Sequence, residues 1–279
     1  MSTKIIVDST ADLAPGIRDR FAVVPLTVTF GDEEYVDGVT IDRQGFYEKL
    51  ETSAVLPFTS QATPYAFEKV LSETLKDGDD AVIITVSSKL SGTYHSAVVA
   101  AEESPGRVFV IDSKNVAIAT GILAEYALTL VEKGLNAERI AWALTVKREK
   151  LRIVALLDTL EYLSRGGRIS KTVAFAGGVL SIKPLAQLKD GEIVLLGKAR
   201  GTKMGYAAIA EEIEQDDVDT SMPFLLGYTG TSDERLRKFK DDQSAILLTF
   251  DSPVRDAHVG SVVGTHAGPG AVAIAYFTK

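Results

Sequence analysis

Three short clusters of hydroxyl-bearing and small residues are the groups in this chain best suited to binding chemistry. Each offers hydrogen-bond donors without a formal positive charge, and backbone N–H groups at a loop or helix start add further donors. Such donors suit a small anion, either a carboxylate or a phosphate. We therefore expect one anion site built from Thr59-Ser60-Gln61, Ser91-Gly92-Thr93 and Gly264-Thr265-His266-Ala267-Gly268-Pro269-Gly270.

His266 stands out within the third cluster because glycines surround it and let backbone approach a ligand closely. Its imidazole can donate or accept a hydrogen bond and titrate near neutral pH. A purely structural loop is the alternative, and we favour a functional His266. His95 and His258 lack such a setting, which indicates surface or packing roles.

The other two clusters each have an equally simple structural explanation. Ser91 precedes a helical stretch and follows a strand-like run, so it fits either a ligand site at the carboxyl end of a parallel strand or an ordinary N-cap. Thr59-Ser60-Gln61 precedes a helix that opens at Thr63-Pro64, and polar loops before helices are common.

The first half of the chain alternates apolar runs with helical patterns, which predicts an α/β unit with a parallel sheet. Gly78 follows the end of the helix that opens at Thr63-Pro64, near Lys76, and Gly134 ends a later apolar helix before Asn136 caps the next. The strands are expected at Ile5–Val7, Val23–Phe30, Ala81–Val86 and Val108–Ile111.

The second half, from Ile153–Leu157 onward, predicts an α/β unit with a mixed sheet. Asp190-Gly191 between two strand-like runs is a strong hairpin signal and implies an antiparallel pair. Asp158 and Glu161 fit a capping box for a short helix that ends at Gly166-Gly167. Helices near Lys203–Glu214 and Asp233–Asp241 and strands near Phe224–Tyr228, Ala245–Phe250 and Ala271–Phe277 complete it. We place a domain boundary near residue 150, between domains 1–150 and 151–279.

Composition excludes several function classes. The net charge of −8 argues against general attraction to nucleic acid or anionic lipid, and the absence of cysteine excludes thiol chemistry and suits the cytoplasm. No apolar run is long enough for a membrane span, and the one at Ile5–Val7 is too short for a secretory signal. Nucleotide-binding and catalytic-metal motifs are missing. Asp8, Asp12, Asp37 and Asp112 near strand ends more often form turns than bind metal, so no metal or cofactor is expected.

Two cationic groups interrupt this acidic chain: Arg165, Arg168 and Lys171, and Lys198, Arg200 and Lys203. Solvated surface is their default interpretation. Arg168 and Arg200 stand beside glycines, however, which presents a guanidinium well to a phosphate or to carboxylates of a partner.

The chain resembles the DegV family nearly end to end. The motifs that carry the resemblance are ordered along the whole sequence. They are Val7-Asp8-Ser9-Thr10-Ala11-Asp12-Leu13, Val24-Pro25-Leu26, Tyr35-Val36-Asp37-Gly38, Thr59-Ser60-Gln61, Ser91-Gly92-Thr93-Tyr94, Ile111-Asp112-Ser113-Lys114, Leu163-Ser164-Arg165-Gly166-Gly167-Arg168-Ile169, Ile182-Lys183-Pro184 and Gly264-Thr265-His266-Ala267-Gly268-Pro269-Gly270. The chain departs from the family pattern at two places, Ala62-Thr63 after Gln61 and His95. Both departures leave the predicted anion site intact.

The resemblance implies a bacterial, two-domain protein that binds a long-chain fatty acid with its tail buried. Thr59, Ser60, Ser91, Gly92, Thr93 and His266 match the polar site for the carboxylate. Such proteins have no catalysis of their own and present the carboxyl group to a separate ATP-dependent fatty acid kinase, whose acyl phosphate product feeds phospholipid synthesis. Arg168, Arg200 and Lys203 match basic positions for that partner or for phosphate.

Two other functions stay open at this point. One is a stand-alone acyl hydrolase with Ser91 as nucleophile and His266 as base, for which no nucleophile elbow and no acid partner can be named. The other is a binding protein for a different lipid-like carboxylate. The identity of the bound molecule separates these cases.

Overall fold

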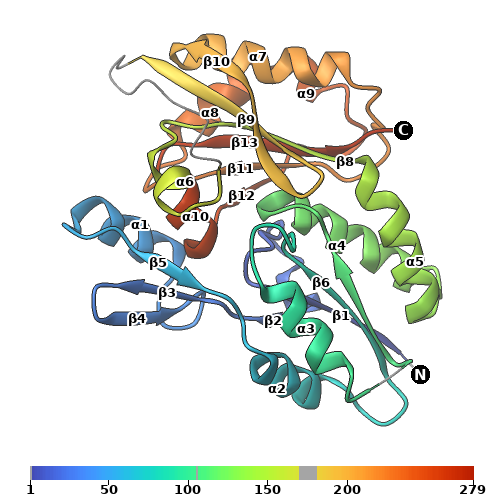
Figure 1. The fold of residues 1–279 in the computed structure, drawn as a ribbon. Helices are drawn as coiled ribbons and strands as arrows, with labels where there is room; N and C mark the ends of the chain where they lie inside the picture. The colour runs from blue at the N-terminus through green and yellow to red at the C-terminus, as the bar shows by residue number, and fades with distance from the viewer. Residues whose placement is uncertain (1, 105, 170–180) are drawn as a thin grey trace.

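The computed structural model describes residues 2–104, 106–169 and 181–279, and Lys171 lies outside them. The fold is α/β, with a parallel sheet in the first half and a larger mixed sheet in the second (Figure 1). Two short 3-10 helices lie at Arg18–Arg20 and Arg148–Lys150. Among the described helices, none is long and apolar enough to cross a bilayer.

The first sheet is parallel throughout, as the alternation of strand and helix patterns predicts. Its central strands are apolar and buried on both faces: Ile5 and Val7 join one core cluster, while Ile6 between them joins another. The strand order is β2 (Ala22–Val24), β1 (Thr3–Asp8), β6 (Asp80–Thr85) and β7 (Val108–Asp112). The helices that pack against it are α2 (Pro64–Thr74), α3 (Thr93–Ala101), α4 (Ala117–Glu132) and α5 (Ala137–Lys147).

The single strand predicted over Val23–Phe30 is wrong, because the structure divides it at Pro25. Proline cannot donate to a ladder, and β2 ends in the parallel sheet just before it. The chain then enters a small antiparallel sheet of β4 (Glu33–Val36), β3 (Thr27–Phe30) and β5 (Phe58–Ser60), beside which lies α1 (Arg43–Thr52).

The second sheet is mixed and contains the predicted hairpin. Asp190 and Gly191 both have positive φ, +52° and +86°, as a type I′ turn requires. The strand order is β10 (Glu192–Arg200), β9 (Ile182–Lys189), β8 (Leu151–Leu156), β13 (Val272–Phe277), β11 (Leu225–Tyr228) and β12 (Asp256–His258). Its further helices are α6 (Glu161–Arg165), α7 (Gly201–Gln215), α8 (Glu234–Asp242), α9 (Ser244–Leu247) and α10 (Ser261–Ala267).

Two other local predictions in the second half are wrong. The run at Ala245–Phe250 begins with helix α9 rather than a strand; Ile246 and Leu247 are buried in this helix, and Phe250 is buried beyond its end. Asp158 does not cap α6; its Oδ1 instead accepts from Lys183 Nζ and Arg235 Nη1, both at 2.6 Å. An ion pair with two cations outcompetes the cap.

Helix α4 joins the two halves of the molecule. It is apolar all round, with eleven of its sixteen residues buried. It packs against β1 and β6 on one side and against β8, β11 and β13 on the other, and its core cluster contains residues from both sheets. Figure 1 shows it between the two sheets. The division at residue 150 stays a prediction.

Buried carboxylates also connect the halves. Asp12 is fully buried, and its Oδ1 accepts from the N–H of Gly260 at 2.8 Å and lies 3.4 Å from Arg43 Nη2. Asp37 Oδ1 accepts from Ser261 Oγ at 2.5 Å. Burial raises the pKa of Asp12 to about 7, and the Arg43 charge only partly opposes that shift.

A pH-dependent stability follows from Asp12. Its folded-state pKa lies above the usual 3.8, so its contribution to the free energy of unfolding is present below about pH 4 and lost as pH rises through about 7. The substitution Asp12→Asn removes this dependence. Urea unfolding from pH 4 to 8 should show the stability of the variant, relative to wild type, rising with pH. Asp32→Asn, at an exposed turn, is the control, and pH curves that run parallel for wild type and Asp12→Asn contradict the expectation.

Candidate functional site

A cavity of about 260 Å³ lies between the two halves and is lined by residues from all three predicted clusters. This volume is slightly below the roughly 300–1,000 Å³ range of small-molecule pockets. Of the predicted site residues, Thr59, Ser60, Ser91, Gly92, Arg168 and His266 line it, together with Gln61. Sequence positions more than 200 apart therefore line the same cavity.

The first polar contact of the site joins Thr59 to His266. Thr59 Oγ1 on β5 lies 2.9 Å from His266 Nε2, a hydrogen bond whose direction depends on the imidazole tautomer. His266 belongs to the last turn of α10, so the expectation of a loop over Gly264–Gly270 is wrong for its first part. The chain leaves the helix at Gly268, whose φ is +71°.

The imidazole of His266 is held in an environment that disfavours its charged form. Burial, and next the charge of Arg168, lower the pKa of His266 from 6.5 to about 4. Its Nδ1 is buried and has no hydrogen-bond partner among the described residues. Contrary to the expectation that His266 titrates near neutral pH, this environment keeps the imidazole neutral there.

Ser91 and Thr93 occupy the turn into α3, as expected for residues at the carboxyl end of a parallel strand. Ser91 Oγ lies 2.9 Å from Thr93 Oγ1 and accepts from the Thr93 N–H at 3.3 Å. Gly92 is the N-cap residue, and a Cβ there would lie 2.0 Å from Gln61 Oε1. Ser91 thus bonds the helix start and lines the cavity, whereas the predicted site residue Thr93 is buried and does not line it.

Arg168 is the only residue with a permanent charge among the described residues that line the cavity. Its guanidinium donates through Nε to the carbonyl oxygen of Leu90 at 3.2 Å and through Nη1 to that of Gly166. These bonds fix its position close to His266. Arg200 and Lys203, in contrast, are exposed where β10 meets α7, outside the cavity lining.

The rest of the cavity is mostly apolar, and its wall was not identified from the sequence. Small and aliphatic side chains of the mixed sheet provide much of it, including Ile153, Ala155, Ala186, Ile193 and Ala273. Only the pairing of β8, β9, β10 and β13 places these residues side by side. The lining residue Thr10 lies in the Val7–Leu13 motif, which was the available signal for it.

The arrangement provides neutral donors and one guanidinium in a mostly apolar cavity, which suits an amphipathic anion. No group of three or more potential metal ligands occurs among the described residues. The predicted packing role of His258 agrees with its contacts. Its imidazole stacks on the ring of Tyr228, with centroids 4.6 Å apart, and on the ring of Tyr47, with centroids 5.1 Å apart.

A substitution at Gly166 tests how His266 is positioned, because a Cβ at residue 166 would lie 2.2 Å from Nδ1 of the imidazole. We expect Gly166→Ala to displace the ring toward solvent and to raise its pKa from about 4 toward 6.5. Overpacking of this kind costs roughly 1–3 kcal/mol of stability. NMR titration of the His266 imidazole measures the shift. Gly197→Ala, where nothing lies within 4 Å, is the matched control, and an unchanged His266 pKa in Gly166→Ala contradicts the positioning role.

Comparisons with known proteins agree along the whole chain. The profile of the family described as "Uncharacterised protein, DegV family" matches residues 2–279. A DegV domain-containing protein of Caldanaerobacter subterraneus subsp. tengcongensis is 32% identical, over 99% of this chain and 98% of its own. The structure of a DegV family protein from Thermus thermophilus, described for its fatty acid binding, is similar with a TM-score of 0.89 and 31% identity, covering 100% of both chains. A stearic acid-binding protein from Eubacterium ventriosum is similar with a TM-score of 0.84 and 28% identity, over 100% of this chain and 99% of that one. The chain therefore belongs to the DegV family.

Proposed function

We propose that this protein binds a long-chain fatty acid, with its carboxylate among Thr59, Ser91 and His266 and its tail along the apolar wall. The observation that carries the proposal is the lining of the cavity, in which hydroxyl and imidazole groups occur together with aliphatic side chains over most of the surface. The relatives from Thermus thermophilus and Eubacterium ventriosum, described as fatty acid-binding, support it.

The energetics of burial support tight retention of such a ligand. A chain of about 16 carbons buried at ~0.8 kcal/mol per methylene contributes on the order of 10 kcal/mol before the costs of association. Neutral donors then orient the carboxylate without enclosing it. A bidentate arginine clamp would occupy both carboxylate oxygens, whereas hydroxyls leave one of them free to react.

We further propose that the protein acts in the cytoplasm as the substrate-presenting subunit of a separate ATP-dependent fatty acid kinase. The family resemblance of the sequence motivates this role. The exposed positions of Arg200 and Lys203 are compatible with contacts to a partner, and Arg168 at the cavity wall is compatible with contact to phosphate. The carboxylate is the nucleophile, and the kinase supplies the ATP site.

The geometry does not favour the hydrolase alternative. A serine hydrolase needs its histidine hydrogen-bonded to the nucleophile and oriented by an acid. Here His266 Nε2 contacts Thr59, Ser91 Oγ contacts Thr93, and His266 Nδ1 has no partner among the described residues. Loss of acyl ester turnover in Ser91→Ala, from a wild type that shows it, would revive this alternative.

The first experiment identifies the bound molecule. Protein purified from a bacterial host is denatured, extracted with organic solvent and analysed by mass spectrometry. A near-stoichiometric fatty acid supports the proposal, and a different amphipathic carboxylate replaces it with the third function considered above. An extract without lipid, from protein that also fails to take up added fatty acid, contradicts it.

Filling the apolar end of the cavity should weaken binding without unfolding the protein. Ala155 is half-buried in the cavity wall, so Ala155→Phe displaces part of the tail. Loss of about three buried methylenes at roughly 0.8 kcal/mol each weakens affinity on the order of 50-fold. Competition with a fluorescent fatty acid measures the change. Ala207→Phe, on the exposed face of α7, is the control, and equal affinities of the two variants contradict the assigned tail site.

The substitution Arg200→Ala distinguishes the two parts of the proposal, fatty acid binding and the role as a kinase subunit. Because Arg200 is exposed and outside the cavity lining, its removal should leave fatty acid binding unchanged. Acyl phosphate formation with the partner kinase should fall on the order of tenfold, as expected when one charge-assisted hydrogen bond to the partner is removed. Arg237→Ala, an exposed arginine on α8, is the matched control. A wild-type rate in Arg200→Ala removes Arg200 from the docking role.

A further inference from the structure

A second cavity, of about 310 Å³, lies next to the first and is polar. Its walls are the loop after β7, the turn that leads into β8, and the end of β9 up to the hairpin turn. Gln187 and Leu188 of β9 line both cavities. None of the site residues assigned above lines this second cavity, so its ligand does not depend on the proposed function.

The charge of this cavity is opposite to that of the whole protein. Four cationic residues line it against two acidic ones, a balance of +2 in a chain whose net charge is −8. Cations gathered in a concave site focus an attractive potential for anions. The cationic residues are Lys114, Arg148, Arg152 and Lys189, and the acidic residues are Glu149 and Asp190.

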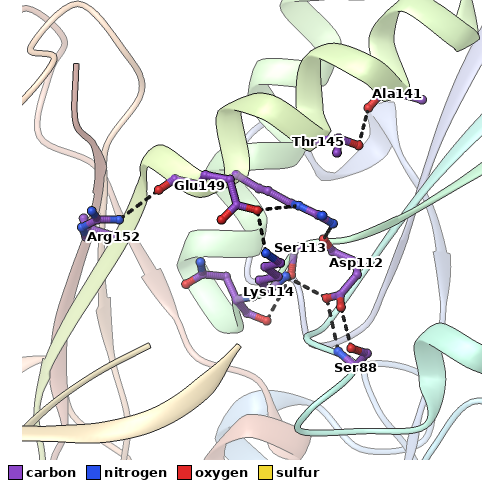
Figure 2. A network of polar contacts seen from close by, with 10 residues as sticks. Ser88, Asp112, Ser113, Lys114, Ala141, Thr145, Glu149 and Arg152 are labelled. Atoms are coloured by element: carbon purple, nitrogen blue, oxygen red, sulfur yellow. Dashed lines mark hydrogen bonds and ion pairs between the residues drawn. The ribbon is translucent and has the colours of Figure 1, made fainter. Parts of the chain in front are cut away.

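A network of polar contacts fixes two of these cations in place (Figure 2). Glu149 Oε1 lies 2.7 Å from Lys114 Nζ and 3.3 Å from Arg148 Nε. Arg148 Nη1 also donates to the carbonyl oxygen of Asp112 at 2.6 Å, and the Asp112 carboxylate holds Ser88 and the N–H of Lys114. Lys114 and Arg148 are therefore held in place by the protein itself.

Two other cations in the wall have capacity for a ligand, and a buried amide oxygen in the same wall has no partner among the described residues. Arg152 Nη1 donates only to the carbonyl oxygens of Glu149 and Leu151, both at 3.2 Å, and no carboxylate lies within 4 Å of Arg152 in the described parts of the chain. Lys189 is exposed and likewise forms no ion pair with a described residue. Asn115 is 4% exposed, and its buried Oδ1 has no partner among those residues.

We propose that this second cavity binds a small molecule that carries a phosphate group. Arg152 offers the forked donors that match phosphate oxygens, and Lys189 adds a compact charge. The volume accommodates a phosphate with a substituent.

Isothermal titration calorimetry tests the site with two probes, inorganic phosphate and adenosine monophosphate, at constant ionic strength. We expect saturable binding of at least one probe, with one site per chain. Tighter binding of adenosine monophosphate identifies a phosphate ester as the ligand, and tighter binding of inorganic phosphate identifies free phosphate. Absence of saturable binding by both probes overturns the proposal.

Matched variants locate the binding. Arg152→Ala and Lys189→Ala should each weaken it about tenfold or more, as expected for loss of a charge-assisted hydrogen bond. Lys238→Ala removes an exposed cation of α8 and should bind as wild type does. Because Lys189 is exposed, we expect Lys189→Ala to keep the fold. This variant therefore tests the site even if Arg152→Ala fails to fold. Equal affinity in wild type and Lys189→Ala, or an equal loss in Lys238→Ala, overturns the assignment to this cavity.

Discussion

Two buried carboxylates hold the start of helix α10, and the polar end of the candidate site depends on them. Asp12 and Asp37 come from the first half of the chain and accept from the N–H of Gly260 and the hydroxyl of Ser261. A buried carboxyl oxygen left without such donors would cost far more free energy than an exposed one. These bonds therefore fix where α10 begins, and the helix then carries His266 to within 2.9 Å of Thr59.

Much of the fold follows from local patterns, and the exceptions have physical causes. The apolar runs of β1 and β6 are buried on both faces, which is why continuous hydrophobicity predicted a parallel sheet. The Asp190-Gly191 turn needs two positive φ angles, and its sequence supplies residues that tolerate them. Short apolar runs such as Ala245–Phe250 fit both the helical and the strand period, so only tertiary packing decides between them.

The candidate site was predictable from the sequence only in its polar part. Hydroxyl and glycine clusters are visible in the sequence because their residue types are unusual together, and six of the predicted residues line one cavity. The apolar wall was not predictable, since alanines such as Ala155 and Ala186 resemble any others until the strands pair. The depressed pKa of His266 depends on burial and on Arg168, and no local pattern encodes either. The roles of these residues in binding stay predictions.

The hairpin turn at Asp190-Gly191 has a practical consequence for protein engineering. Surface turns of this kind usually accept inserted peptides, labels or fusion partners. Here the carbonyl oxygen of Gly191 accepts from Ser87 Oγ at 2.7 Å, so the second half of the molecule is anchored to the first at this turn. A tag inserted there would strain β9, the strand that separates the two cavities. The Gly31-Asp32 turn, exposed and without a described partner across the molecule, is the better place for a reporter.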